Sequence, residues 1–285
     1  MTEEMVLLIV ISALALTGHA KRRPLAPVSD ATALGLTDDE LALLGERAAF
    51  IDGRRQGRTS VGGPCQLLQA KDGWIALNLA RHDDLDLLPA WLDSDSGIEA
   101  VGDRLVDELD ERAALLGLPA AKVGVAAPPA EPFRTTPIGE PATRGSATLI
   151  VDLSSLWAGP LTANLLGERI LGSTVVKVES TRRPDGARQG PQPFFDLLHG
   201  GHDAVAIDLT TADGVNALNK LIDRADIVIE AARPRVMQNW GIDPATVAER
   251  KPGLIWLSIT AYGRTGTSAN RVGFGDDAAA AGGLV

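Results

Sequence analysis

Three arginines stand close together in the segment "VKVESTRRPDGARQG": Arg182, Arg183 and Arg188. A guanidinium group forks onto the oxygens of a phosphate or carboxylate, so a cluster of this kind can bind an anionic ligand. The cluster follows a short run of β-branched residues and lies among residues that favour turns. The other interpretation is an ordinary solvated loop, because runs of charge commonly face water.

A second candidate is the strand, turn and helix predicted within "VDLSSLWAGPLTANLLG", residues 151–167. The small residues Ala158 and Gly159 would let a ligand approach the main chain, and Pro160 suits the first helical turn, whose free N–H groups attract anions. A plain tight connection would use the same residues, since glycine and proline occur in most turns. Glu179 ends the next strand where a dinucleotide-binding fold has its ribose acid. The first turn lacks G-x-G-x-x-G, however, which argues against NAD.

The other residue types that carry chemistry give weaker indications. His199 and His202 are three positions apart, but no acidic or cysteine ligand completes a set, so we predict no metal site. Cys65 is the only cysteine, which excludes an intrachain disulfide and a zinc site built on thiolates. No G-x-S-x-G motif is present, so a serine hydrolase is not indicated.

The elements that must position these residues alternate between strand and helix in the second half of the chain. Short β-branched runs such as "TLIVDLS", "TVVKVES" and "DIVIEA" are separated by predicted helices. One of these helices begins at Pro160, and two others cover residues 212–225 and 244–250. This alternation predicts an α/β fold with a doubly wound, mostly parallel, Rossmann-like sheet. Such sheets bind ligands at the carboxyl ends of their strands, where the candidate residues lie.

The first part of the chain predicts a smaller α+β domain. Residues 71–73, Lys-Asp-Gly, separate two apolar runs and therefore indicate a β-hairpin, and residues 82–118 carry apolar residues at helical spacing. Residues 127–147 are rich in Pro, Ala, Thr and Gly, which predicts a linker. We therefore expect domains at 1–126 and 148–285.

Composition and charge limit the classes of partner. The chain has 285 residues and a formal net charge of −10, which opposes binding to nucleic acid or to an anionic membrane. The apolar segment Met5–Gly18 is too short to span a bilayer, and Glu3 and Glu4 precede it where a signal peptide has basic residues. We therefore expect a buried helix there and, with a single cysteine, a cytoplasmic protein.

Six segments of the second half, in this order, resemble the class III CoA-transferases, the family of formyl-CoA transferase, carnitine CoA-transferase and α-methylacyl-CoA racemase. The segments are Asp152 with "AGP", then "VKVE", "HGGHDAVAIDL", "ADIVIEAARP", "PGLIWLSITAYGRTG" and "RVGFGDDAAAAGGLV". The resemblance implies an enzyme that handles acyl-CoA and transfers CoA between carboxylic acids, or isomerises an acyl-CoA. It implies coenzyme A as substrate, without metal or NAD, and an interlocked homodimer for a complete member.

The resemblance also implies where coenzyme A would bind. The turn after the first strand would receive its adenosine diphosphate part, the main chain after the third strand would flank the adenine, and the end of the second strand would face phosphate. The residues implied in binding are Trp157, Ala158, Ser180, Arg182, Arg183, Ile207, Asp208 and Leu209.

This sequence departs from the family's pattern in three places. The family's "E-N-F-R-P" reads "EAARP", and Gly275 stands at the acidic position of "R-P-G-Y-D". The nucleophilic aspartate is expected beyond Val285, because Asp276 and Asp277 align with apolar family positions. Segments that resemble the family's small domain precede the nucleotide-binding half, which indicates a tandem or permuted and truncated member.

Two other functions fit parts of the sequence. A non-catalytic CoA-binding paralogue or scaffold would need the same binding residues and no nucleophile. The codons that follow Val285 distinguish it from an enzyme, since they either encode the missing aspartate or do not. An NAD-dependent oxidoreductase is opposed by the missing glycine motif.

Overall fold

The computed structural model describes residues 47, 50–51, 56–124, 134–142, 145 and 147–283. The apolar segment Met5–Gly18 and part of the expected linker, 127–147, lie outside the described residues. No helix in the described part of the chain is both long and apolar enough to cross a bilayer.

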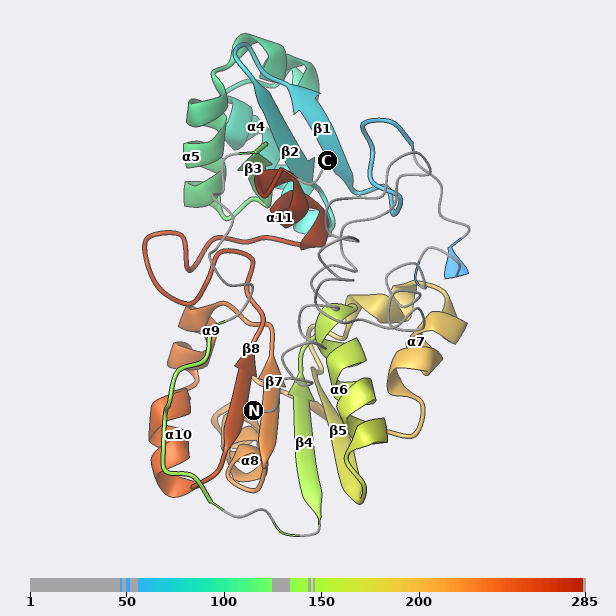
Figure 1. The fold of residues 1–285 in the computed structure, drawn as a ribbon. Coiled ribbons are helices and arrows are strands. Elements are labelled where there is room, and N and C mark those ends of the chain that lie inside the picture. The colour runs from blue at the N-terminus through green and yellow to red at the C-terminus, as the bar shows by residue number, and fades with distance from the viewer. Residues whose placement is uncertain are drawn as a thin grey trace. The chain divides into compact units, whose positions relative to one another are not determined.

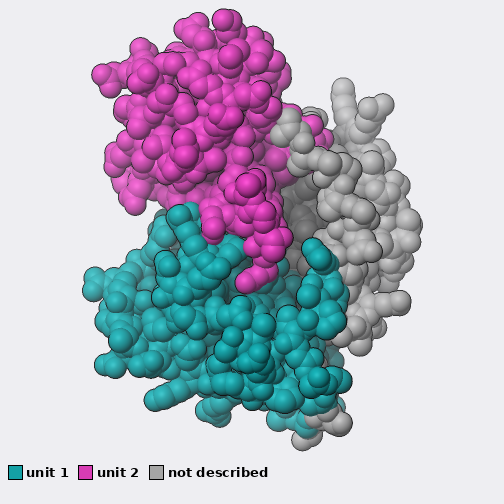
Figure 2. All heavy atoms as spheres, turned by 90° about the vertical axis from the view of Figure 1, so that its left-hand side faces the viewer, with its two compact units in different colours: residues 1–12, 132–260 teal, residues 13–131, 261–285 magenta. Residues whose placement is uncertain are grey.

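The described residues form two compact units, coloured teal and magenta in Figure 2. Residues between 132 and 260 belong to the first unit. The described residues between 47 and 124 form the second unit together with residues 261–283. The second unit is therefore assembled from two segments that are far apart in the sequence. The domain division expected at residues 127–147 remains a prediction.

The first unit contains a parallel sheet of five strands in the order β6-β5-β4-β7-β8 (Figure 1). Val151 at its centre pairs with Val176 on one side and Val228 on the other, and these β-branched residues suit a strand buried on both faces. The strands are β4 Thr148–Leu153, β5 Ser173–Ser180, β6 Asp203–Ile207, β7 Ile227–Glu230 and β8 Ile255–Ser258. The strand order reverses between β4 and β7, which confirms the predicted α/β fold with a parallel sheet.

Helices cover both faces of this sheet, as a doubly wound fold requires. Helix α6 packs against β4 and β5, and Gly167 on it faces Val175. On the other face Val151 and Val228 share a core with α8, α9 and α10 through Leu218, Met237 and Val247. The helices are α6 Ala158–Arg169, the 3-10 turn η4 Gly186–Gln189, α7 Gln192–His199, α8 Ala212–Ile222, α9 Pro234–Asn239 and α10 Pro244–Arg250.

The second unit contains an antiparallel sheet in the order β1-β2-β3. Gln69 pairs with Trp74 across the turn at Lys71-Asp72-Gly73, which confirms the predicted hairpin. The helical elements cover one face, where Ile75, Trp91 and Leu109 are buried together. The elements are β1 Cys65–Gln69, β2 Trp74–Asn78, η2 His82–Leu87, α4 Leu88–Leu92, η3 Gly97–Asp103, α5 Val106–Leu116, β3 Ala120–Lys122 and α11 Gly275–Ala281.

Two polar contacts attach the C-terminal segment to this small sheet. Arg271 forks onto Asp110, with Nη1 2.9 Å from Oδ2 and Nη2 2.6 Å from Oδ1. Asn78 Nδ2 on β2 donates to Asp277 Oδ1 on α11 at 3.0 Å. Asp277 is fully buried. Residues 65–122 and residues 261–283 therefore form one folded unit.

Candidate functional site

The carboxyl ends of three neighbouring strands bring together the residues predicted to bind a ligand. The strand order places β4, β5 and β6 side by side, and each is followed by predicted residues. Trp157 and Ala158 follow β4, Ser180 ends β5, and Ile207 ends β6. Arg182, Arg183, Asp208 and Leu209 lie in the loops that follow β5 and β6.

The ends of β5 and β6 are joined by short-range contacts among these residues. The Thr181 N–H donates to the Ile207 carbonyl at 3.0 Å, and the Arg183 N–H donates to the Ser180 carbonyl at 3.2 Å. Arg182 Nε lies 3.5 Å from Asp208 Oδ2, although the Arg182 side chain is 70% exposed. Such an exposed ion pair contributes little to stability, so a phosphate can displace it at small cost.

Arg188 differs from the other two arginines of the loop. Its guanidinium binds both carboxylate oxygens of Glu179, with Nε 3.1 Å from Oε1 and 3.0 Å from Oε2. The same group lies 4.3 Å from the centre of the Phe195 ring. The hydrogen bond from Arg188 lowers the pKa of Glu179. Arg188 therefore holds Glu179 in place. Of the three arginines, Arg182 and Arg183 remain the candidates for binding an anion.

The turn between β4 and α6 has a buried and an exposed part. Trp157 is buried, with its ring edge-on to Phe194 at 6.2 Å between centroids. Ala158 is also buried, whereas the Leu156 side chain is 42% exposed. Gly159 has Ser154 directly beside it: an added Cβ would lie 2.0 Å from Ser154 Oγ. The glycine predicted to admit a ligand is thus also required by packing within the turn.

Sequence reasoning missed a cluster of buried charges beneath this turn. Lys177, Asp152 and Asp185 are each at most 2% exposed. Burial raises the pKa of Asp152. Burial, and then the neighbouring Lys177, lower the pKa of His199 beside the cluster to about 4, so this histidine is neutral at pH 7. A lysine inside the apolar run "TVVKVES" was the sequence signal, because a charge on a doubly covered strand must find a buried partner.

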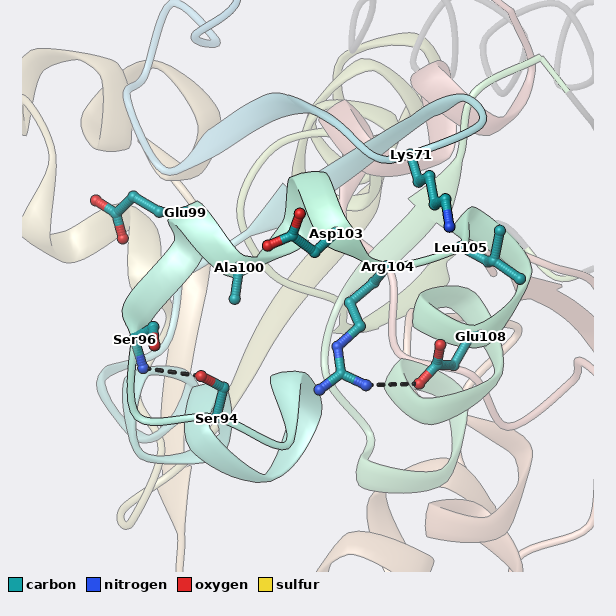
Figure 3. Close-up of a pocket in the computed structure, with 9 residues that line it drawn as sticks. All are labelled: Lys71, Ser94, Ser96, Glu99, Ala100, Asp103, Arg104, Leu105 and Glu108. Carbon is teal, nitrogen blue, oxygen red and sulfur yellow. Dashed lines mark hydrogen bonds and ion pairs between the residues drawn. The ribbon is translucent and has the colours of Figure 1, made fainter.

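Two hollows of the surface lie away from the predicted residues. One of about 550 Å³ lies in the second unit and is shown in Figure 3. It has both signs of charge, and Arg104 points toward Glu108 at 3.2 Å. Another of about 410 Å³ lies near the starts of β5 and β6, beside Thr174 and His202. Neither hollow is lined by a residue predicted to bind coenzyme A.

The histidines do not belong to a metal set in the described ranges, where no group of three or more His, Cys, Asp or Glu side chains could hold an ion. The rings of His199 and His202 lie 5.9 Å apart between centroids. Both ring nitrogens of His199 are buried without a hydrogen-bond partner.

Comparison with known proteins relates the second half of the chain to a family of enzymes. Residues 146–285 match the model of CoA-transferase family III. This part of the chain is therefore similar to the CoA-transferases of family III. The match begins just before β4 and includes every residue that the sequence resemblance assigned to coenzyme A.

Individual proteins similar to this chain include named CoA-transferases. The alpha subunit of the succinyl-CoA–L-malate CoA-transferase of Chloroflexus aurantiacus is 33% identical over 170 residues, 55% of this chain and 38% of that protein. A probable fatty acyl-CoA transferase of Mycobacterium tuberculosis is 33% identical over 145 residues, 48% of this chain and 36% of that protein. A crystal structure of the M. tuberculosis protein covers 44% of this chain and 34% of its own, at 35% identity and a TM-score of 0.39.

The (R)-2-hydroxy-4-methylpentanoate CoA-transferase of Clostridioides difficile is 32% identical over 135 residues, which are 44% of this chain and 33% of that enzyme. The chain therefore spans between 33% and 38% of the length of these three curated relatives.

Proposed function

We propose that this protein binds coenzyme A at the carboxyl edge of the parallel sheet and serves in transfer of CoA between carboxylic acids. One observation carries the proposal. Residues from the ends of β4, β5 and β6, which the family resemblance assigns to coenzyme A, lie at one edge with two exposed arginines. Parallel sheets receive ligands at this edge.

The charges of this edge suit the phosphates of coenzyme A. Arg182 and Arg183 are exposed, and Arg182 forms an ion pair with the partly exposed Asp208. A phosphate offers stronger acceptors than Asp208, and a guanidinium binds it through two parallel N–H donors. The edge thus supplies a local positive charge on a chain whose formal net charge is −10.

Replacing Arg182 and Arg183 by alanine is expected to weaken coenzyme A binding by about 1–3 kcal/mol, roughly 5- to 150-fold in Kd. Isothermal titration calorimetry measures this change. The matched control is Arg250→Ala, because Arg250 is also an exposed arginine of the first unit with an aspartate partner, Asp223, at 2.8 Å. Equal affinity in the double variant and the wild type would contradict the proposed site, as would tighter binding of NAD than of coenzyme A.

Asp277, in the last motif, is unsuited to carry the acyl group. Asp277 is fully buried, and its Oδ1 accepts hydrogen bonds from Asn78 and from the Phe274 N–H. A carboxylate nucleophile must instead reach the thioester carbon. We therefore propose that the transfer step needs an aspartate other than Asp277, and a non-catalytic CoA-binding role fits the same observation.

The finer assignments are part of the same proposal. We infer acyl-CoA and a carboxylic acid as substrates, a homodimer, a cytoplasmic location, and no need of a metal or NAD. The packing of α11 on β2 and β3 supports the idea that residues 1–126 carry a small-domain segment placed ahead of the nucleotide-binding half. Light scattering after size-exclusion chromatography tests the dimer directly.

A further inference from the structure

A buried lysine lies at the centre of the charge cluster beneath the β4–α6 turn. Lys177 on β5 is 1% exposed, and its Nζ lies 3.0 Å from Asp185 Oδ2 and 3.6 Å from Asp152 Oδ2. The same ammonium donates a hydrogen bond to the Ser154 carbonyl. Removing a charge from water is costly, so a buried lysine persists only where several acceptors surround it.

The two carboxylates extend this cluster to the main chain of the turn. Asp185 Oδ1 accepts from the Leu156 N–H and from the Ala187 N–H, each at 2.9 Å. Asp152 Oδ1 accepts from the Ser154 N–H at 2.9 Å and from the Ser154 hydroxyl. Lys177 therefore connects the turn after β4 with the loop after β5.

The turn that the cluster holds has an unfavourable backbone conformation. Leu156 has φ of +72°, and Asp93 is the only other non-glycine residue with positive φ in the described part of the chain. In this region the Cβ of an ordinary side chain crowds the following carbonyl. Glycine would adopt the conformation freely, but the chain places a half-exposed leucine there. The conformation therefore needs support from its surroundings.

We propose that Lys177 and Asp185 are positioning residues for coenzyme A, which hold Leu156 in the left-handed conformation and thereby fix the turn that leads into α6. This inference rests on the proposed function. Strained backbone persists where neighbouring contacts overdetermine it, and it gathers at ligand sites. A pair of apolar residues would stabilise the strands as well as a buried ion pair does. Unlike apolar residues, these charged groups form hydrogen bonds with the main chain at the carboxyl ends of the strands, where the ligand is proposed to bind.

Asp185→Leu tests the inference, because leucine has a similar size and cannot accept the Leu156 N–H. The substitution leaves Lys177 with Asp152, a balanced pair, so the variant is expected to fold. Its matched control is Asp226→Leu, because Asp226 lies just before β7, at the amino ends of the strands of the same sheet. Asp226 accepts the Leu149 N–H at 2.9 Å and lies 3.1 Å from Lys251 Nζ. Asp226→Leu thus loses one lysine partner and one backbone hydrogen bond, and Asp185→Leu loses one lysine partner and the backbone hydrogen bonds from Leu156 and Ala187.

The affinity for coenzyme A, measured by calorimetry on folded protein, is expected to fall about tenfold or more in Asp185→Leu and to stay unchanged in Asp226→Leu. In a Leu156→Gly background the same Asp185→Leu change is expected to cost at most about threefold, because glycine needs no support for positive φ. Equal losses in both backgrounds, or in both aspartate variants, would overturn the inference.

A second substitution leaves the buried charges intact. Leu156→Val at this half-exposed position disfavours positive φ, since a β-branched side chain is stiff and crowded there. We expect it to bind coenzyme A more weakly than Leu156→Gly. Tighter binding by Leu156→Val than by Leu156→Gly would contradict the role of the left-handed conformation, even if Asp185→Leu did not fold.

A measurement without ligand separates this inference from the proposed function. Hydrogen exchange of the Leu156 amide is expected to accelerate in Asp185→Leu, and that of Leu149 only in Asp226→Leu. An unchanged Leu156 amide would refute the positioning role alone. A wild-type chain that binds no coenzyme A would refute the proposed function, and the inference about the ligand would fall with it.

Discussion

Replacing Gly159 by alanine is expected to destabilise the protein by about 3 kcal/mol or more, the upper part of the range for overpacked sites. An alanine Cβ would lie 2.0 Å from Ser154 Oγ and 2.2 Å from Ser154 Cβ. Moving the Ser154 side chain aside would break its hydrogen bond to the buried Asp152. Urea unfolding followed by circular dichroism measures the loss.

Gly145→Ala is the matched control for this substitution, because a Cβ at Gly145 meets nothing within 4 Å. The double variant Ser154→Gly/Gly159→Ala should unfold at higher urea than Gly159→Ala alone, since it removes the atoms that the new Cβ meets. Stability of Gly159→Ala equal to that of Gly145→Ala would mean that the turn is packed differently.

Replacing Asp277 by asparagine is expected to stabilise the protein at about pH 8 by up to about 3 kcal/mol, the free energy of the pKa difference. Burial raises the pKa of Asp277 from 3.8 to about 6. A raised pKa means that the folded state binds the proton more tightly. Its contribution to stability is complete below pH 3.8 and is lost as the pH rises through about 6. Asparagine carries no charge and keeps an oxygen for the Asn78 amide.

The difference in unfolding free energy between Asp277→Asn and the wild type should therefore grow as the pH rises from about 4 to about 8. Asp86→Asn, an exposed substitution in the same unit, serves as the control. A difference that does not change with pH would show that Asp277 is not buried as a titrating group. The measurement needs only the purified chain and no ligand.

The sheet of the first unit could be predicted because its strands are short β-branched runs, such as "TVVKVES", between segments of helical spacing. The hairpin at Asp72-Gly73 could be predicted from a local turn preference. The placement of α11 on β2 and β3 could not, because that contact joins residues separated by most of the chain. The helical pattern of "GDDAAAA" does not specify which surface the helix packs against.

The candidate site was predicted in part. The positions of Arg182 and Arg183 follow from the rule that loops at strand ends receive ligands. The pairing of Arg188 with Glu179 depends on how the loop folds back onto β5. The positive φ of Leu156 and the burial of Lys177 depend on the same folded loop, since no local pattern favours them. From composition alone, the role of Arg188 cannot be distinguished from those of Arg182 and Arg183.

The central claim is that coenzyme A binds at the carboxyl ends of β4, β5 and β6. Hydrogen exchange with mass spectrometry, on the wild-type chain with and without coenzyme A, tests it most directly. The account predicts protection confined to peptides that contain residues 154–160, 180–183 and 207–209, and no protection of these peptides by NAD. Protection at residues 94–108, around the hollow of the second unit, or no protection at any peptide would contradict it.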